Sequence, residues 1–591
     1  MIRVQHQMSN KTIRHKLIIS VLFFLLFGNI LLLNFSPLPG YVYSFYEHIP
    51  ILFWIFSIVA FFIASLILIE FRSFQIKYVY ILYFFLILFN NAIILFSPYM
   101  CGAYIMNCGD LPTHGGMVLD IIYKGKIDFN INFYPVTHIL AFVISAIGNI
   151  NYMDSIKLLS PFFSLLLPIY LYILCKEIID DTFIQIQTFL ISSTFYLSSL
   201  FQTNTITTPN GLSLLMLPLI FYLFIKNSKK SFAICFILLL TTFLFFHPLT
   251  SFMLLFSFSF IYFVGKISKS QIYYNGILYF ICGFLAYLFY LTTIWVHPIK
   301  NIYYFFSGYA IHPGYAVDIS ENLDKLGLRG YDLVSFFIKV FGHQAMLLLL
   351  SFVSTILLLL RIKNKNSKEI WVITILSFIL ISDLAFLVQI IIPTAFNISF
   401  FRFLLYALVF SPILSSVVLS KFFSAIRLRR SFTIFILLFL FTNSLFVVYP
   451  SPYITEMNGQ LSLADLSGSR WLLQHKSANI GSSGYFGNGI TIRMISGLIP
   501  YTEFHNSRYN IWMDKNSILP DHLGYENNSN IWDTVREQRY LIINKYDIIA
   551  YTQVYKKVAR LSLNDLEKLK RDNTSSLIYF NGEYMNYYIS R

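Results

Sequence analysis

Long apolar runs separated by short polar loops make up the first three quarters of the chain. A helix needs about twenty mostly apolar residues to cross the hydrocarbon core of a bilayer. Runs of this length, or close to it, lie at residues 17–33, 50–69, 78–97, 136–147, 157–175, 183–201, 211–225, 231–246, 248–264, 275–296, 343–360, 370–392, 400–420 and 432–449. The pattern therefore predicts an α-helical polytopic transmembrane domain over residues 1–449.

The last quarter of the chain, residues 450–591, alternates helical and β-rich patterns. The expected helices cover residues 463–475, 530–540 and 564–571, and the expected strands cover residues 547–552, 577–580 and 584–589. The glycine-rich stretch GSSGYFGNG at 481–489 lacks the spacing of a dinucleotide-binding loop, so we interpret it as turns. A soluble α/β domain is predicted here.

Lysine and arginine gather in short clusters between the apolar runs. These clusters begin at Arg3, Lys226, Lys266, Arg361 and Lys421. Because short loops rich in Lys and Arg stay in the cytoplasm, the N-terminus is predicted to be cytoplasmic. Most of the net charge of +15 belongs to this topology signal, so it does not indicate nucleic-acid binding.

The basic clusters place the outer loops 98–135 and 297–342 and the C-terminal domain outside the cytoplasm. The loop 202–210 is also predicted to lie outside, yet three apolar runs separate it from loop 98–135, where an even number of crossings is required. The run 136–147 has about twelve residues, too few to cross, so we predict that it lies at the membrane surface. About 13 transmembrane helices remain, in a multi-pass protein of the cell membrane.

Composition supports a membrane protein and limits the chemistry. The chain is 57% hydrophobic and 12% charged, whereas soluble proteins carry roughly 25% charged residues. Five cysteines without metal-binding spacing argue against a zinc ribbon or a disulfide framework. Cys101 and Cys108 share one outer loop, where a disulfide is a hypothesis and two free thiols are the alternative.

The outer loop 98–135 holds the first polar residues of interest. After Asp110, an apolar stripe with helical spacing contains His114, Met117, Val118, Ile121 and Ile122. This stripe predicts an amphipathic helix along the membrane surface. Asp110 has two interpretations: it caps this helix, or its carboxylate faces a cavity at the lipid surface.

Other polar residues stand at the ends of apolar runs. Gly125 ends the predicted surface helix; Tyr134, Pro135 and His138 open the next run; His247 and Pro248 mark an outer junction; and Arg402 enters a late span in NISFFRFLLY. Together with Asp110, His114 and an outer C-terminal domain, this layout resembles the GT-C superfamily of membrane glycosyltransferases. The prokaryotic, archaeal-like members that use polyprenyl phosphate sugars are the most similar.

The resemblance implies both an activity and its partners. GT-C enzymes pass a sugar or oligosaccharide from a polyprenyl phosphate carrier to an acceptor outside the membrane, and their first outer loop supplies the catalytic Asp. It implies that Asp110, with His114 beside it, acts in catalysis, and that the partners are a polyprenyl-phosphate sugar donor, the lipid bilayer and an extracytoplasmic acceptor (an envelope glycan, a lipid or a protein).

Cations are expected to stabilise the charge that develops on the departing lipid phosphate. Arg402, Arg329 and Lys300 are candidates, since the guanidinium fork binds phosphate oxygens bidentately. The substrate-binding candidates are Arg402, Arg329, His247, Tyr134 and His138. Snorkelling to the interface is the alternative for Arg402, and helix-end packing is the alternative for His247, His297 and His312, each of which precedes a proline.

The sequence departs from the family in its metal-binding and acceptor motifs. The C-terminal domain has no Trp-Trp-Asp motif, and Pro112 stands where a D-x-D pair after Asp110 would need its second carboxylate. We therefore expect metal-independent, inverting transfer without a cofactor, with a divalent metal as the less favoured alternative. The alternative functions are an envelope polysaccharide polymerase or ligase and a membrane transporter. A transporter would hold its ionisable residues near mid-membrane, whereas nearly all acidic residues here lie in loops, with Asp383 in run 370–392 as the exception.

Overall fold

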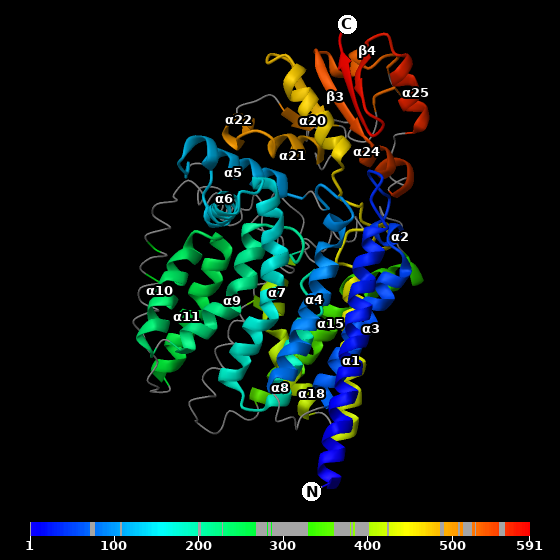
Figure 1. Ribbon diagram of the computed structural model, residues 1–591. Coiled ribbons are helices and arrows are strands. Elements are labelled where there is room, and N and C mark those ends of the chain that lie inside the picture. Colours follow the sequence, from blue (N-terminus) through cyan, green and yellow to red (C-terminus); the bar gives the residue numbers. More distant parts are fainter. Residues whose placement is uncertain are drawn as a thin grey trace.

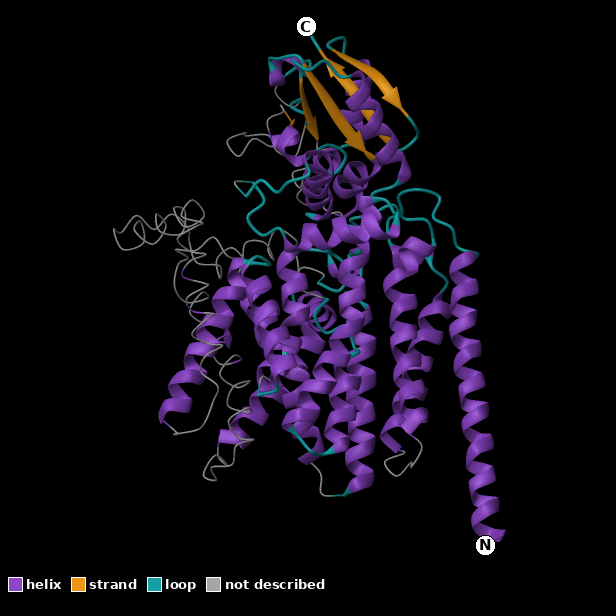
Figure 2. Ribbon diagram, turned by 60° about the vertical axis from the view of Figure 1, so that its left-hand side comes forward, coloured by secondary structure: helices purple, strands orange, loops and turns teal. Residues whose placement is uncertain are grey.

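The computed structural model describes residues 2–70, 77–106, 109–129, 131–198, 203–226, 228–267, 281, 285, 329–359, 379, 382–383, 401–421, 425–484, 490–505, 509–511, 523–525, 528–554 and 562–591. The helices form an elongated bundle, and a small β-sheet lies beyond one end of it (Figure 1). We call this the domain-side end. The first helix begins at the opposite end (Figure 2). The predicted fold class, a helical membrane protein with a C-terminal α/β domain, is confirmed.

The bundle is built from helices α1 (Ile2–Asn34), α2 (Phe45–His48), α3 (Ile51–Glu70), α4 (Lys77–Met100), α5 (Leu111–Lys124), α6 (Val136–Gly148), α7 (Tyr152–Ile178), α8 (Thr182–Ser192), α9 (Pro209–Lys226), α10 (Lys230–Leu244), α11 (Pro248–Ile267), α15 (Tyr331–Leu359), α17 (Phe401–Val409), α18 (Ser411–Lys421) and α19 (Ile426–Leu445). Among the described residues, seven helices are long and apolar enough to span a membrane, or up to eight if one bent pair counts as a span. The predicted number of about 13 is not confirmed. Runs 275–296 and 370–392 lie almost entirely outside the described residues, and the apolar helices found in runs 183–201 and 231–246 are shorter than 18 residues.

The run predicted to stay at the surface forms the short helix α6. It has 13 residues, about 20 Å at 1.5 Å per residue, against a hydrocarbon core of roughly 30 Å. Figure 1 shows α6 almost end-on while α7 stands upright, so α6 lies across the bundle direction. This geometry agrees with the prediction that run 136–147 does not cross.

The run predicted to span at 183–201 is only partly helical. α8 ends at Ser192, and the chain continues in turns. The hydroxyls of Ser193 and Thr194 donate to carbonyl oxygens of the preceding turn, at 2.8 and 2.7 Å. Such side-chain bonds compete with helical ones. Non-helical backbone is tolerated at membrane depth where protein surrounds it, and residues 193–198 are all buried.

The run at 400–420 is also broken. α17 and α18 meet at an angle of 49°, and Pro412 lies in the first turn of α18. Proline has no N–H to bond to the preceding turn, so a continuous helix is interrupted there. Arg402, in the first turn of α17, acts electrostatically on Tyr134 and His247.

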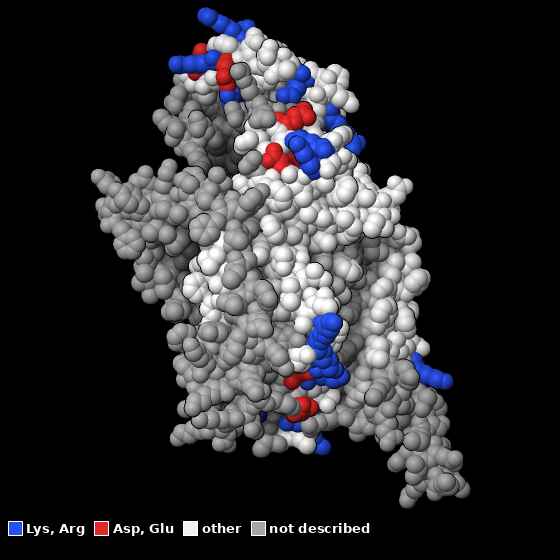
Figure 3. Space-filling model, turned by 90° about the vertical axis from the view of Figure 1, so that its left-hand side faces the viewer, with Lys and Arg blue, Asp and Glu red and all other residues white. Residues whose placement is uncertain are grey.

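Charged side chains occupy two levels of the molecule. On the face in Figure 3 the charged side chains gather on the C-terminal domain and toward the opposite end of the bundle, and the described residues visible between these two levels are uncharged. At that opposite end Lys226 pairs with Glu177 at 2.5 Å. An uncharged band between charged ends is the surface that a multi-pass membrane protein presents to lipid.

The C-terminal domain contains a five-stranded sheet in the order β2-β1-β3-β5-β4. Its elements are η1 (Pro452–Ile454), α20 (Leu463–His475), β1 (Gly481–Gly484), α21 (Ile490–Ser496), α22 (Tyr501–His505), β2 (Tyr509–Ile511), α23 (Trp532–Val535), β3 (Arg539–Asn544), α24 (Lys545–Ile549), η2 (Ala550–Val554), α25 (Leu563–Arg571), β4 (Ser575–Phe580) and β5 (Tyr584–Ile589). Strand β1 pairs in parallel with β2 and β3, and β5 runs antiparallel to β3 and β4.

Sequence patterns located some of these elements and misassigned others. The predicted helix 463–475 and strand 584–589 are α20 and β5. The predicted strand 547–552 is wrong: a capping box between Asn544 and Asp547 starts helix α24 there. The predicted helix 530–540 shrinks to the four residues of α23, and the glycine stretch read as turns begins with strand β1.

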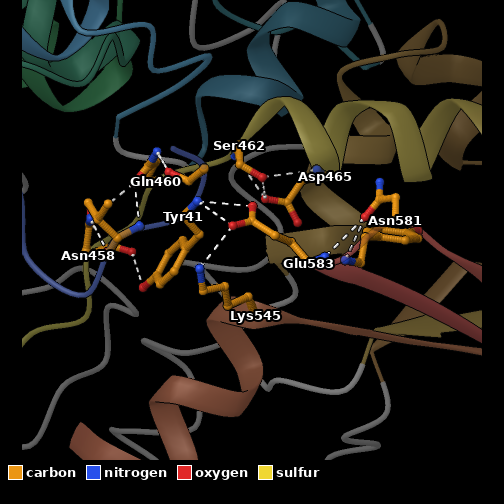
Figure 4. A network of polar contacts seen from close by, with 11 residues as sticks. Tyr41, Asn458, Gln460, Ser462, Asp465, Lys545, Asn581 and Glu583 are labelled. Carbon is orange, nitrogen blue, oxygen red and sulfur yellow. Dashed lines mark hydrogen bonds and ion pairs between the residues drawn. The ribbon is translucent and has the colours of Figure 1, made fainter. Parts of the chain in front are cut away.

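The sheet is fastened to the first loop of the bundle by Glu583, in the turn between β4 and β5 (Figure 4). Its carboxylate accepts from the backbone N–H of Tyr41 at 2.9 and 3.0 Å and pairs with Lys545 at 3.1 Å. A Cβ atom on Gly40 would lie 2.3 Å from Glu583 Oε1, and Gly40 has a φ of +141°. Glycine is therefore required where the two domains meet.

Candidate active site

Asp110 immediately precedes α5 at the domain-side end of the bundle. Its backbone is helical (φ −89°, ψ 0°), and within the described chain its side chain caps no backbone N–H. The capping interpretation is therefore wrong, since a capping side chain needs an extended backbone to reach the first turn. Instead, Asp110 Oδ1 lies 2.9 Å from Arg493 Nη1, with 62% of the Asp110 side chain exposed.

Helix α5 is enclosed between the bundle and the C-terminal domain. Residues 111–121 are buried except for Thr113, which is partly buried. The predicted helix is therefore present but covered by protein over most of its length, and its position along a membrane surface stays a prediction. A Cβ on Gly115 would lie 2.6 Å from Met153 Cε of α7, and a Cβ on Gly116 would lie 2.0 Å from the Ser496 carbonyl oxygen of α21. Two adjacent glycines thus allow close approach on two sides. An amphipathic pattern does not reveal which partner covers a helix.

Polar contacts fix the position of the C-terminal domain on α5. The hydroxyls of Thr113 and Ser496 lie 3.0 Å apart. Farther along the helix, Thr502 donates from its backbone N–H and its hydroxyl to the Asp120 carboxylate, at 3.0 and 2.6 Å. Ser496 lies one turn after Arg493 on α21, and Thr502 directly follows Tyr501. These contacts therefore hold Arg493 and Tyr501 close to α5.

Two buried histidines form a hydrogen-bonded chain beside Asp110. Asn132 Oδ1 accepts from His138 Nδ1 at 2.9 Å, and His138 Nε2 lies 3.0 Å from His114 Nδ1. A neutral His138 that donates from Nδ1 has no proton on Nε2, so His138 Nε2 accepts from His114 Nδ1–H. The Nε2 atom of a neutral His114 then carries a lone pair and can accept a hydrogen bond. The predicted residues His114 and His138 are therefore in direct contact.

Burial keeps both imidazoles neutral. Burial lowers the pKa of His114 to about 4, while the Asp110 carboxylate acts in the opposite direction. Burial, followed by the neighbouring His114, lowers the pKa of His138 well below its usual value. A neutral His114 can accept a hydrogen bond at Nε2 near neutral pH.

Tyr134, His247 and Arg402 form the other half of the cluster. The Tyr134 and His247 rings lie 5.5 Å apart. Burial is the main cause that lowers the pKa of His247 to about 3, and Arg402 and then His114 lower it further. Burial raises the pKa of Tyr134; Asp110 raises it further, and Arg402 lowers it. Tyr134 therefore lies within electrostatic reach of both the carboxylate and the guanidinium.

Arg329 is the remaining predicted site residue that the structure describes. Arg329 lies exposed before α15, a helix that packs mainly against α18 and α19. Lys300, His297 and His312 lie outside the described residues, and the run around Asp383 is described only at isolated positions. Six predicted site residues thus converge, and Arg329 does not.

Three residues of the site were not predicted from the sequence. Arg493 and Tyr501 come from the C-terminal domain, and Asn132 comes from the loop before α6. The pairing of Arg493 with Asp110 joins residues far apart in sequence, so no local pattern indicates it. Asn132, six residues before His138, was the one that inspection of the loop could have singled out.

Cys101 is buried and has a free thiol, which donates to the Leu33 carbonyl oxygen at 3.6 Å. The hypothesised disulfide is therefore not formed in this structure, and Cys108 lies outside the described residues. In the part of the chain that is described, no three His, Cys, Asp or Glu side chains are grouped to hold a metal ion. Metal independence stays a prediction.

Comparison with known proteins finds similarity only in structure. Neither a protein-family model nor a curated protein sequence matches the chain. The apo oligosaccharyltransferase of Archaeoglobus fulgidus has a TM-score of 0.47 and 11% identity, covering 88% of this chain and 75% of that one. ArnT from Cupriavidus metallidurans, solved with undecaprenyl phosphate, has a TM-score of 0.43 and 9% identity, covering 87% and 98%.

A further match is the Archaeoglobus fulgidus oligosaccharyltransferase AglB in complex with an inhibitory peptide and a dolichol-phosphate, with a TM-score of 0.44 and 10% identity over 86% of this chain and 74% of that one. All three matches have TM-scores below 0.5 and identities of 11% or less, so they describe a partial likeness of fold. They assign no role to any residue of this chain.

Proposed function

We propose that this protein is a glycosyltransferase that moves a sugar from a polyprenyl-phosphate donor to an extracytoplasmic acceptor, with inversion at the anomeric carbon. One observation carries the proposal: at one end of the bundle the Asp110 carboxylate pairs with Arg493 and acts electrostatically on the neutral His114, while Tyr134 lies within electrostatic reach of both Asp110 and Arg402. Displacement of a phosphate leaving group needs both a proton acceptor and cations.

The reaction is a single displacement. The acceptor hydroxyl oxygen attacks the anomeric carbon while the bond from that carbon to the phosphate oxygen breaks. Asp110 takes the hydroxyl proton, and the electron pair of the broken bond leaves on the lipid phosphate. Attack from the face opposite the phosphate inverts the configuration.

The histidines position the substrate in this scheme. His114 Nε2 accepts a hydrogen bond from a sugar or acceptor hydroxyl, because its Nδ1–H is committed to His138. Asn132 in turn fixes the tautomer of His138. A pKa of about 4 for His114 makes it a weak proton acceptor near pH 7, which leaves the role of base to Asp110.

The cations face the leaving group. Arg402 stands in the first turn of α17 and acts electrostatically on Tyr134 and His247. Its fork suits the phosphate oxygens of the donor. Tyr134 and His247, whose rings contact each other, form an aromatic wall beside it.

The proposal is tested with the purified full-length protein, a polyprenyl-phosphate sugar and a membrane extract as the acceptor source. Release of free polyprenyl phosphate, coupled to appearance of the sugar in the acceptor fraction, is expected to continue in the presence of a metal chelator. Asp110→Asn removes proton acceptance at nearly constant shape and is expected to lower the rate by on the order of a hundredfold or more. Asp533→Asn, at an exposed tail position, is the matched control.

Several results would contradict the proposal. An Asp110→Asn protein with parent-like melting behaviour and a rate within a few fold of the parent would exclude Asp110 as the base. Loss of all activity in chelator, with recovery on adding a divalent cation, would remove the metal-independent part. Movement of intact donor across a reconstituted membrane without cleavage would favour the transporter alternative.

A further inference from the structure

We propose that Arg493 exchanges anionic partners: it holds the Asp110 carboxylate in the resting enzyme and moves to the donor phosphate when the donor binds. The inference rests on the proposed function and adds a residue of the C-terminal domain to the donor site. Donor binding then frees the Asp110 oxygen that Arg493 occupies. The base becomes available when a reactive sugar is present.

The strength of the ion pair suits such an exchange. Arg493 Nη1 and Asp110 Oδ1 are 2.9 Å apart, with side chains 39% and 62% exposed. Exposed ion pairs contribute little net stability, because water screens the charges and two side chains must be ordered. A phosphate that accepts two parallel N–H bonds from the guanidinium is a stronger partner than this single contact.

The backbone that carries Arg493 is held in place. Its carbonyl oxygen accepts from Ser496 Oγ at 2.6 Å and from the Gly497 N–H at 3.2 Å. Ser496 in turn meets Thr113 of α5, and Gly116 leaves no space for a Cβ under the Ser496 carbonyl oxygen. The long Arg493 side chain can therefore change partner without movement of α21.

The exchange brings two arginines to one anion from two domains. Arg402 belongs to the bundle, and Tyr134 lies within electrostatic reach of both Arg402 and Asp110. Since Arg493 contacts Asp110 directly and Tyr134 senses both Asp110 and Arg402, the exchange places the donor phosphate beside Tyr134, between the two arginines. The C-terminal domain thus contributes to donor binding.

The test measures binding of a short-chain polyprenyl monophosphate to purified full-length protein in detergent micelles. Arg493→Gln is expected to weaken binding by about tenfold, because a charge-assisted bidentate contact is lost. Asp110→Asn is expected to tighten binding several-fold, because the competing carboxylate is gone. The double variant should bind the lipid phosphate like Arg493→Gln alone. The control is Arg536→Gln, which should bind like the parent, because Arg536 is exposed and its Nε donates to a nearby carbonyl oxygen.

The outcomes separate this inference from the proposed function. Parent-like affinity in Arg493→Gln, or weaker binding in Asp110→Asn, overturns the exchange and leaves the transferase proposal standing. A parent protein that binds no polyprenyl phosphate overturns both. If Arg493→Gln melts well below the parent, Arg493→Lys is tested in its place. Lysine keeps the positive charge but lacks the guanidinium fork, so the exchange then requires that the affinity for the lipid phosphate falls by a few fold.

Discussion

At the scale of single residues, the buried histidine pair gives the site its pH dependence. Burial lowers the pKa of His114 to about 4 and that of His138 well below normal. Between the unfolded-state value of about 6.5 and the lowered folded-state values, the unfolded chain binds more protons. Stability is therefore complete above about pH 6.5 and is lost as the pH falls through this window.

This linkage predicts a titration of stability. From pH 7 to pH 5 the melting temperature of the parent should fall, with up to about 1.4 kcal/mol lost per pH unit for each buried histidine. His114→Gln should show a shallower fall, because one linked proton is removed. Melting in detergent measures this, with His475→Gln, an exposed position on α20, as control. Equal slopes in His114→Gln and the parent would refute the linkage.

At the scale of elements, the contact between α5 and α21 decides whether the site assembles. A Cβ on Gly116 would lie 2.0 Å from the Ser496 carbonyl oxygen, a backbone atom that cannot rotate away. Gly116→Ala therefore forces α21 outward and separates Arg493 from Asp110. Overpacking of this kind costs about 1–3 kcal/mol.

We expect Gly116→Ala to lower the melting temperature, to expose the C-terminal domain to protease, and to reduce transfer at least tenfold. The matched control is Gly148→Ala at the end of α6, where the nearest atoms would stand at ordinary contact distances of 3.7 and 3.8 Å. A Gly116→Ala protein with the stability and activity of the parent would contradict the expectation that close contact between α5 and α21 is needed to assemble the site.

At the scale of the whole molecule, the C-terminal domain and the start of α1 lie at opposite ends of the bundle (Figure 1). The basic residues around Lys229 lie at the end away from that domain. Since basic loops stay in the cytoplasm, we predict that the C-terminal domain faces outward.

Cysteine labelling tests this orientation. An impermeant maleimide should label Ser529→Cys in intact cells and should label Lys229→Cys only after lysis; both positions are exposed. Unmodified protein reports the background from Cys235, which is also exposed. Reversal of the two patterns would place the site in the cytoplasm and would contradict an extracytoplasmic acceptor.

The sequence alone determined the features that depend on local patterns. Apolar runs predicted the helical bundle, and the dozen-residue length of run 136–147 indicated a helix too short to cross, as α6 is. Patterns at 463–475 and 584–589 placed α20 and β5. The resemblance also singled out Asp110, His114, Tyr134, His138, His247 and Arg402, which converge in space.

Only the tertiary structure decided what these residues contact. The sequence left helix capping open as an alternative to catalysis for Asp110, and it did not indicate that the partner of Asp110 is Arg493, a residue hundreds of positions away. The stripe on α5 predicted a surface helix, yet α21 covers its other face through Gly116. Periodicity reports that one face is apolar and does not report what packs on the opposite face. Contacts between distant segments depend on how the two domains dock, so no local pattern encodes them.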